Sequence, residues 1–226
     1  MDIEKERVMP SVEKELDVIP VGDAMAVGSN YEKRKLLLEQ LKKDIDVNYK
    51  VVLFASGDED SESAHYVAAA KMEVDRRNQA KLIEVRKEWE QDLENDTKWK
   101  QYLCELALYI ESDLLAEKEA QIYKKEYCSN VLEALEKRKT SISSVEYTKC
   151  LSYLVSLKQY EMVDNLWQQI SDQDKEEESY WVILQMHHER LDKEKFYNCL
   201  DELSKSEIKL SAEGLKMLRY WKERGQ

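Results

Sequence analysis

The stretch Tyr147–Ser171, YTKCLSYLVSLKQYEMVDNLWQQIS, is echoed without a gap by Tyr180–Ser204, YWVILQMHHERLDKEKFYNCLDELS. The offset between the two stretches is 33 residues, and like residues stand opposite one another at six positions. These pairs are Tyr147/Tyr180, Leu151/Leu184, Glu161/Glu194, Asn165/Asn198, Ile170/Leu203 and Ser171/Ser204. A third half-unit follows at an offset of 34 residues, where Met217-Leu218 echoes Ile183-Leu184. A self-match at this period predicts stacked helical hairpins, which bind and organise other molecules far more often than they catalyse reactions.

Each of the two stretches carries the apolar spacing of two helices. The first helix of each hairpin is predicted from Tyr147, Cys150, Leu151 and Leu154, and from Tyr180, Ile183 and Leu184. The second helix is predicted from Met162, Val163, Leu166, Trp167 and Ile170, and from Phe196, Leu200 and Leu203. We expect the turns within the hairpins at Lys158-Gln159 and at Asp192-Lys193. The hydroxyl-rich segment 140–144 offers an N-cap before the first hairpin.

The remainder of the chain is also predicted to be helical. Between Gly57 and Gly214 there is neither glycine nor proline, which favours helices joined by short polar turns. A long charged helix is expected from about residue 62 to 94, with Ala69, Met72, Ala80, Ile83, Trp89 and Leu93 as its apolar positions. Asn95 then caps a helix that carries Trp99, Leu103, Leu106, Ile110 and Leu114. The predicted fold is all-α: an extended arm with one amphipathic helix over 1–60, long charged helices over 61–140, and a short α-solenoid of hairpin repeats over 141–226.

Composition excludes several classes of function. The net charge of −12 disfavours a free-standing nucleic-acid binder, because such proteins neutralise phosphates with Lys and Arg. No glycine-rich phosphate loop or nucleophile motif is present, so we expect no enzyme and no cofactor. The pair His187-His188 lacks further ligands at helical spacing, which argues against a metal site. The four cysteines show no metal-site spacing and indicate buried free thiols. No apolar run is long enough to span a bilayer, so no membrane partner is expected.

The region from about Ser143 to Gly225 resembles pentatricopeptide repeats, with tetratricopeptide repeats as the close structural cousin. The resemblance depends on the hairpin length, on the Tyr that starts each first helix, and on the inter-repeat passage Glu202–Ser211, ELSKSEIKLS. It covers the last third of the chain. The resemblance implies an organellar, usually mitochondrial, protein that binds single-stranded RNA or belongs to an RNA-processing or ribosomal assembly.

The resemblance also implies where a ligand would be read. RNA-reading members of the family place small polar residues just after the Tyr of each first helix, and here these places hold Thr148, Trp181 and Leu215. Thr148 fits that pattern, whereas Trp181 and Leu215 depart from it and favour a protein scaffold. Tyr220 and Trp221 near the C-terminus are also expected to contact a partner, because Tyr and Trp are enriched at interface hot spots.

These observations lead to one main hypothesis and two alternatives. The main hypothesis is a non-catalytic scaffold or adaptor subunit of a larger, RNA-handling assembly, whose acidic surface steers a helical or basic protein partner. The first alternative is direct binding of single-stranded RNA, with Lys149, Lys205 and Lys209 at the phosphates. The second alternative is a cytosolic tetratricopeptide-type adaptor. We expect a mitochondrial location if the resemblance holds and the chain is a mature form or a fragment, and a cytoplasmic one otherwise.

Overall fold

In the computed structural model, residues 61–137 and 142–224 are described, and they form helices and connections with no β-strand among them. This confirms the all-α class. The helices are α4 (Ser61–Glu90), α5 (Asp96–Ile110), α6 (Glu117–Lys137), α7 (Ser144–Ser156), α8 (Tyr160–Gln169), α9 (Glu177–Glu189), α10 (Lys193–Lys205) and α11 (Ala212–Arg224). The arm predicted for residues 1–60 lies outside the described residues. The chain divides into two compact units, Met1–Glu84 and Val85–Gln226, which we describe separately.

The described part of the first unit is the helix α4 as far as Glu84. Its buried positions are Ala70, Val74 and Leu82. The predicted apolar stripe of this helix is therefore wrong, because Met72 and Ile83 are 73% and 50% exposed. The buried face uses small and β-branched side chains, while the two larger ones point to solvent.

Within the second unit, α5 and α6 form an antiparallel pair whose start follows the predicted cap. The side chain of Asn95 accepts a hydrogen bond from the backbone N–H of Lys98 at 3.2 Å, which satisfies a free donor of the first turn. The helix ends at Ile110, so Leu114 lies in the connection and not on α5 as predicted. In that connection Asp113 takes a left-handed conformation with φ of 58°, which reverses the chain.

The hairpins α7–α8 and α9–α10 share the same local geometry at an offset of 33 residues. Capping boxes open both first helices: the N–H of Ser143 is accepted by Glu146, and the N–H of Glu176 by Ser179. Lys158 and Leu191 have φ values of 58° and 57°, and these left-handed residues end the first helices and reverse the chain. The turn at Lys158-Gln159 is thus confirmed. The second turn lies one residue earlier than predicted, because Lys193 already begins α10.

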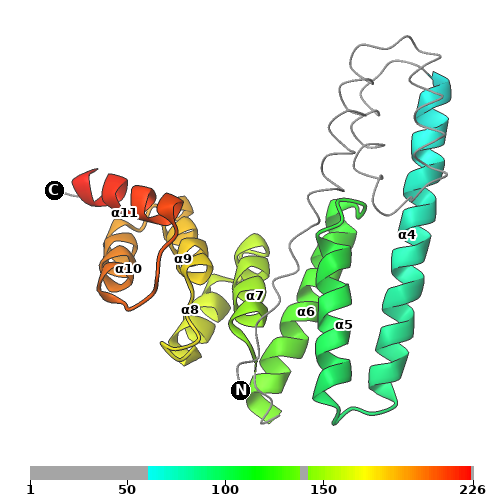
Figure 1. Ribbon diagram of the computed structural model, residues 1–226, viewed down its shortest axis with the longest axis horizontal. Helices are drawn as coiled ribbons and strands as arrows, with labels where there is room; N and C mark the ends of the chain where they lie inside the picture. The colour runs from blue at the N-terminus through cyan, green and yellow to red at the C-terminus, as the bar shows by residue number, and fades with distance from the viewer. Residues whose placement is uncertain (1–60, 138–141, 225–226) are drawn as a thin grey trace, which may run out of the picture. The chain divides into compact units, whose positions relative to one another are not determined.

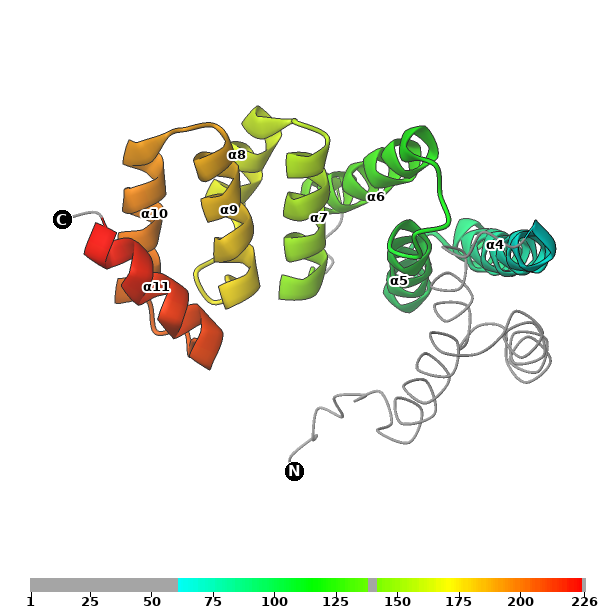
Figure 2. The ribbon, with the colours of Figure 1, turned by 90° about the horizontal axis from the view of Figure 1, so that it is seen from above.

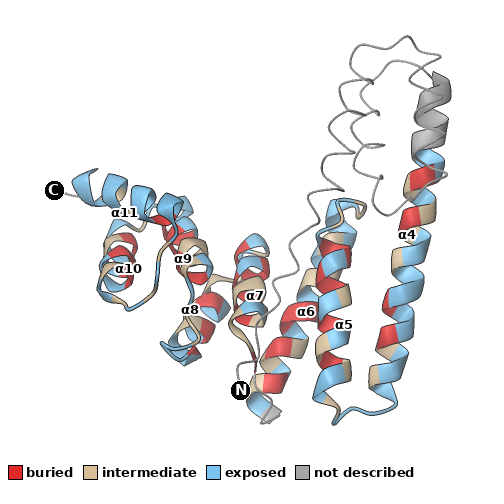
Figure 3. Ribbon diagram, viewed as in Figure 1, coloured by how far each residue is buried: buried red, intermediate tan, exposed pale blue. Residues whose placement is uncertain are grey.

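The helices of the second unit pack in sequence order (Figures 1 and 2). The helix α7 contacts α6, α8 and α9, while α9 also contacts α10 and α10 contacts α11. Figure 3 shows buried residues along α5, α7 and α9, and a largely exposed α11. Leu106, Cys150, Leu151, Leu154 and Val163 are fully buried, so the core continues from α5 into the first hairpin.

Three triads, each a tyrosine, a glutamate and a cation, connect neighbouring segments of this unit. They are Tyr102/Glu126/Arg86, Tyr153/Glu111/Lys149 and Tyr180/Glu202/Lys175. In each, the phenol donates to the carboxylate, which is also ion-paired with the cation. Burial, followed by the carboxylate, raises the pKa of all three tyrosines. Tyrosine is therefore used inside this protein where its hydroxyl has a partner, which explains why Tyr greatly outnumbers Phe.

Candidate partner-binding site

The predicted site residue Trp181 lies at the junction of α9 and α11. Its indole N–H donates to Glu177 at 3.1 Å, and the same carboxylate accepts from the backbone N–H and the hydroxyl of Ser211. Burial alone would raise the pKa of Glu177, but the hydrogen bonds from Ser211 and Trp181 lower it. The half-buried indole therefore helps to hold the start of α11 against α9.

The start of α11 fixes how this helix aligns with the two preceding first helices. The N–H of Gly214 donates to the hydroxyl of Ser211 at 3.0 Å, so Ser211 caps α11 as Glu176 caps α9. The caps are 35 residues apart, one more than the offset of 34 in the sequence echo. In this register Leu215, not Gly214, stands at the position of Tyr180.

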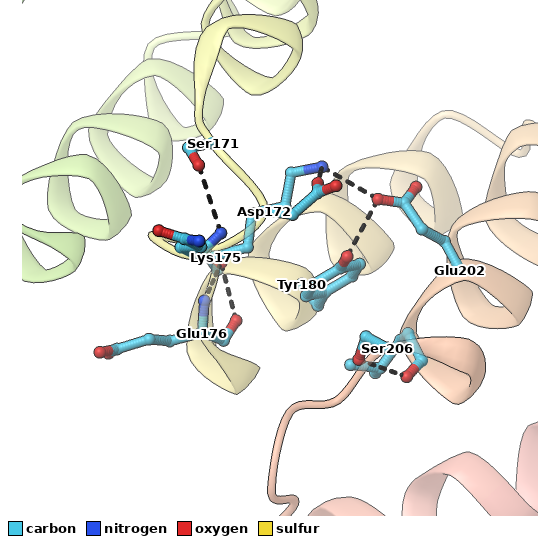
Figure 4. A network of polar contacts seen from close by, with 10 residues as sticks. Ser171, Asp172, Lys175, Glu176, Tyr180, Glu202 and Ser206 are labelled. Atoms are coloured by element: carbon cyan, nitrogen blue, oxygen red, sulfur yellow. Dashed lines mark hydrogen bonds and ion pairs between the residues drawn. The ribbon is translucent and has the colours of Figure 1, made fainter.

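A buried lysine lies between the two hairpins (Figure 4). The side chain of Lys175 is 10% exposed, and its ammonium group contacts Asp172 at 2.9 Å and Glu202 at 3.0 Å. The ammonium also lies 4.6 Å from the ring centre of Trp167, which packs edge-on against Tyr180. Burial would lower the pKa of Lys175, but its hydrogen bonds to Asp172 and Glu202 outweigh this and raise it. The charge is thus fully partnered inside the chain.

A polar groove of about 610 Å³ lies beside this network. Its lining includes Lys175, Tyr180 and Glu202 together with Lys205 and Ser206 at the end of α10. Because the polar groups of the triad already satisfy one another, this groove offers few free groups to a ligand.

A second, aromatic groove of about 350 Å³ lies where α9, α10 and α11 meet. The ring of Trp221 lies 5.1 Å from Phe196 and 5.6 Å from His188, in edge-to-face arrangements. Tyr197 packs on Phe196 at 5.4 Å. Leu191 also lines this groove and is 83% exposed, the most exposed large apolar residue among those that the structure describes. The predicted site residue Trp221 therefore forms part of a preformed apolar groove.

Below this groove, His187 is buried in the hairpin with a polar atom unsatisfied. It is 5% exposed, and its Nδ1 has no hydrogen-bond partner. Burial lowers the pKa of His187, although Asp164 and Asp192 oppose this effect. The equivalent residue of the first hairpin is the fully buried Leu154. The histidine is thus a neutral substitute for a core leucine.

The other predicted partner-binding residues lie apart from one another. Thr148 is half-buried on α7, one hairpin before Trp181. Leu215 and Tyr220 lie on α11 and are 42% and 47% exposed, and Met217 beside them is 42% exposed. The structure therefore brings Trp181, Leu215, Tyr220 and Trp221 to the α9–α11 end of the unit and leaves Thr148 on the preceding hairpin.

Two of the three lysines proposed for RNA phosphates are engaged within the chain. Lys149 is ion-paired with Glu111, and Lys205 with Asp201. Lys209 is exposed in the connection between α10 and α11. An RNA phosphate would have to compete with these carboxylates for Lys149 and Lys205.

The metal, thiol and membrane expectations can be compared with the described residues. Across 61–137 and 142–224, no group of three or more His, Cys, Asp or Glu side chains is arranged to hold a metal ion. All four cysteines are free; Cys128, Cys150 and Cys199 are buried, and Cys104 is exposed. Burial raises the pKa of Cys199 to about 12. Of the helices in the same residues, none has an apolar segment of membrane-spanning length.

Sequence reasoning missed Leu191, Lys175 and Glu202 as residues of these grooves. The repeat itself carried a signal for two of them. At the offset of 33 residues, Leu191 replaces Lys158, and Lys175 replaces the buried Ile142. A change of polarity between equivalent positions therefore marks both. Glu202 replaces Gln169 and gave no comparable signal.

No protein-family model matches the chain, and neither the curated proteins nor the solved structures show a significant match to it. A functional assignment therefore depends on the internal repeat, the geometry and the chemistry of the surface.

Proposed function

We propose that this chain is a non-catalytic scaffold subunit that binds a protein partner through a short array of helical hairpins. One observation carries the proposal: the caps, the left-handed turn residues and the buried first-helix positions recur at the same offset in α7–α8 and α9–α10. Units that repeat their local geometry stack on one another, and stacked hairpins present an extended binding surface.

The helix α11 fits the array as a terminal, capping element. In the register set by the caps, α11 has Arg219 and Lys222 where α9 has Leu184 and His187. Both residues of α9 are buried, whereas Arg219 and Lys222 are exposed. A polar outer face is typical of the last unit of a repeat array, because no further unit covers it.

The contacts of the lysines favour a protein partner over RNA. The carboxylates of Glu111 and Asp201 already neutralise Lys149 and Lys205, and the chain as a whole is acidic. A binder that follows a phosphate backbone depends on free cations along its path. The resemblance to pentatricopeptide repeats extends the proposal to an RNA-handling assembly in mitochondria, with contacts to its protein subunits.

A pull-down from a lysate with the purified chain, with and without RNase, tests this function. We expect co-purifying proteins that persist after RNase treatment, and no RNA bound directly to the purified chain. Recovery of RNA together with loss of every protein on RNase treatment would replace the scaffold by an RNA-binding protein. The identities of the RNase-resistant proteins test the mitochondrial assignment.

A further inference from the structure

The turn of the second hairpin reverses the polarity seen in the first. Leu191, at 83% exposure, stands where Lys158 stands in the first hairpin, and the buried His187 stands where Leu154 stands. An exposed leucine in the left-handed region gains nothing from burial, and this conformation costs about 1–2 kcal/mol for a residue other than glycine. Lys158 has the same backbone conformation, so the fold requires the turn and not the leucine.

Leu191 stands beside a groove of suitable size for the side chains of a partner. The volume of about 350 Å³ lies at the low end of the roughly 300–1,000 Å³ of small-ligand pockets. Phe196, Tyr197, Trp221 and His188 supply its aromatic lining, and Leu191 stands at its edge in solvent. An apolar anchor that entered the groove would also cover Leu191.

The charge of this end of the molecule differs from that of the rest. Residues 193–224 carry eight Lys and Arg against six Asp and Glu, a net charge of +2, within a chain of net charge −12. Residues 144–192 carry four basic and ten acidic residues, a net charge of −6. Lys193 lines the groove itself, and Arg219 and Lys222 are exposed on α11. An acidic partner is attracted to this end and repelled by the hairpin before it.

We infer that the groove formed by His188, Leu191, Phe196, Tyr197 and Trp221 binds an acidic segment of a partner protein, which inserts an apolar side chain beside Leu191. This inference rests on the proposed scaffold function and specifies its partner. It revises the expectation of a basic partner, because the local charge at the groove opposes the charge of the whole chain. A protein segment fits better than RNA, since Leu191 is aliphatic and Phe196 and Trp221 already present their rings to each other.

Titration of the full chain with two synthetic helix-forming peptides tests the site. The peptides share leucine and phenylalanine anchors and differ only in carrying Glu or Lys at every charged position. We expect the Glu peptide to bind at least tenfold more tightly than the Lys peptide, and its affinity to fall as salt is raised. Leu191→Lys should weaken the Glu peptide at least fivefold. The mirror variant Lys158→Leu is the matched control and should bind as the wild type does.

Circular dichroism of both variants shows whether they keep the helical fold, which is expected because both side chains are exposed. Equal affinity for the two peptides, or no effect of Leu191→Lys, would overturn the site. Displacement of the Glu peptide by poly-uridine would assign the groove to RNA. A concentration-dependent dimer lost in Leu191→Lys would assign it to a second copy of the chain. Either result overturns the inference. RNase-resistant partners captured equally by the wild type and Leu191→Lys would uphold the scaffold function and reject this groove.

Discussion

The hairpins α7–α8 and α9–α10 share their capping boxes, their left-handed turn residues and their helix lengths before the turn. They differ in where apolar and polar side chains stand around the turn. The first hairpin has a buried Leu154 and a Lys at its turn, whereas the second has a buried His187 and an exposed Leu191. Because the first hairpin shows which residues the fold needs, the departures of the second hairpin point to binding.

The largest effect is expected at the position that the two hairpins share most closely. Leu151 and Leu184 are equivalent and 0% and 2% exposed. Leu151→Ala and Leu184→Ala should each lower the free energy of unfolding by about 2–5 kcal/mol, from lost apolar transfer and the cavity left behind. Denaturant unfolding measures both. If one variant is nearly neutral, the two hairpins are not equivalent units.

The next effect concerns the buried histidine. His187→Leu restores the residue type of the first hairpin and removes an unsatisfied Nδ1, so it should raise the free energy of unfolding by about 1–3 kcal/mol at pH 7.

The same variant has a pH signature. The pKa of His187 is lowered in the fold, so the unfolded chain binds its proton more readily below pH of about 6.5. Wild-type stability should thus be present above that pH and fall as pH drops through the folded pKa. Asp164 and Asp192 reduce this loss, and Arg190 and Lys195 increase it. Thermal unfolding between pH 7.5 and 5 should show a shallower loss for His187→Leu, and parallel curves would contradict the assignment.

A smaller effect is expected at the left-handed turn residues. Leu191→Gly and Lys158→Gly should each stabilise the fold by about 0.5–1 kcal/mol, because glycine adopts positive φ without strain but gains freedom in the unfolded chain. Similar gains in both would confirm that the turn geometry is common to the hairpins. Destabilisation by Leu191→Gly alone would show that the leucine supports the fold, and would remove the argument for its role in binding.

The smallest effect is expected at Gly214→Ala. A Cβ there would lie 1.9 Å from the Glu177 carboxylate, which caps Ser211 at the start of α11. Alanine gains about 1 kcal/mol in helix propensity, and displacing the carboxylate costs about the same. We expect a net change within about 0.5 kcal/mol, measured by denaturant unfolding. A full gain of about 1 kcal/mol would mean that Glu177 does not stabilise the α9–α11 junction.

The sequence allowed the helical class, the two hairpins and the first turn to be predicted, since the spacing of residues such as Leu151 and Leu184 depends only on local periodicity. It did not allow the buried stripe of α4, because Met72 and Ile83 are as apolar as the smaller residues that are buried instead. Nor did it locate the aromatic groove, which joins residues of α9, α10 and α11 that only tertiary packing brings together. Trp181 was predicted from its position after Tyr180, yet its bond to Glu177 depends on α11 lying alongside.

The most direct test compares two opposite exchanges between the hairpins, Leu191→Lys and Lys158→Leu, in an RNase-treated pull-down followed by mass spectrometry. Our account predicts that both variants remain helical, that Leu191→Lys loses the acidic partners of the wild type, and that Lys158→Leu retains them. Retention of the same partners by both variants, or their loss from both, would contradict the claim that the second hairpin departs from the first in order to bind.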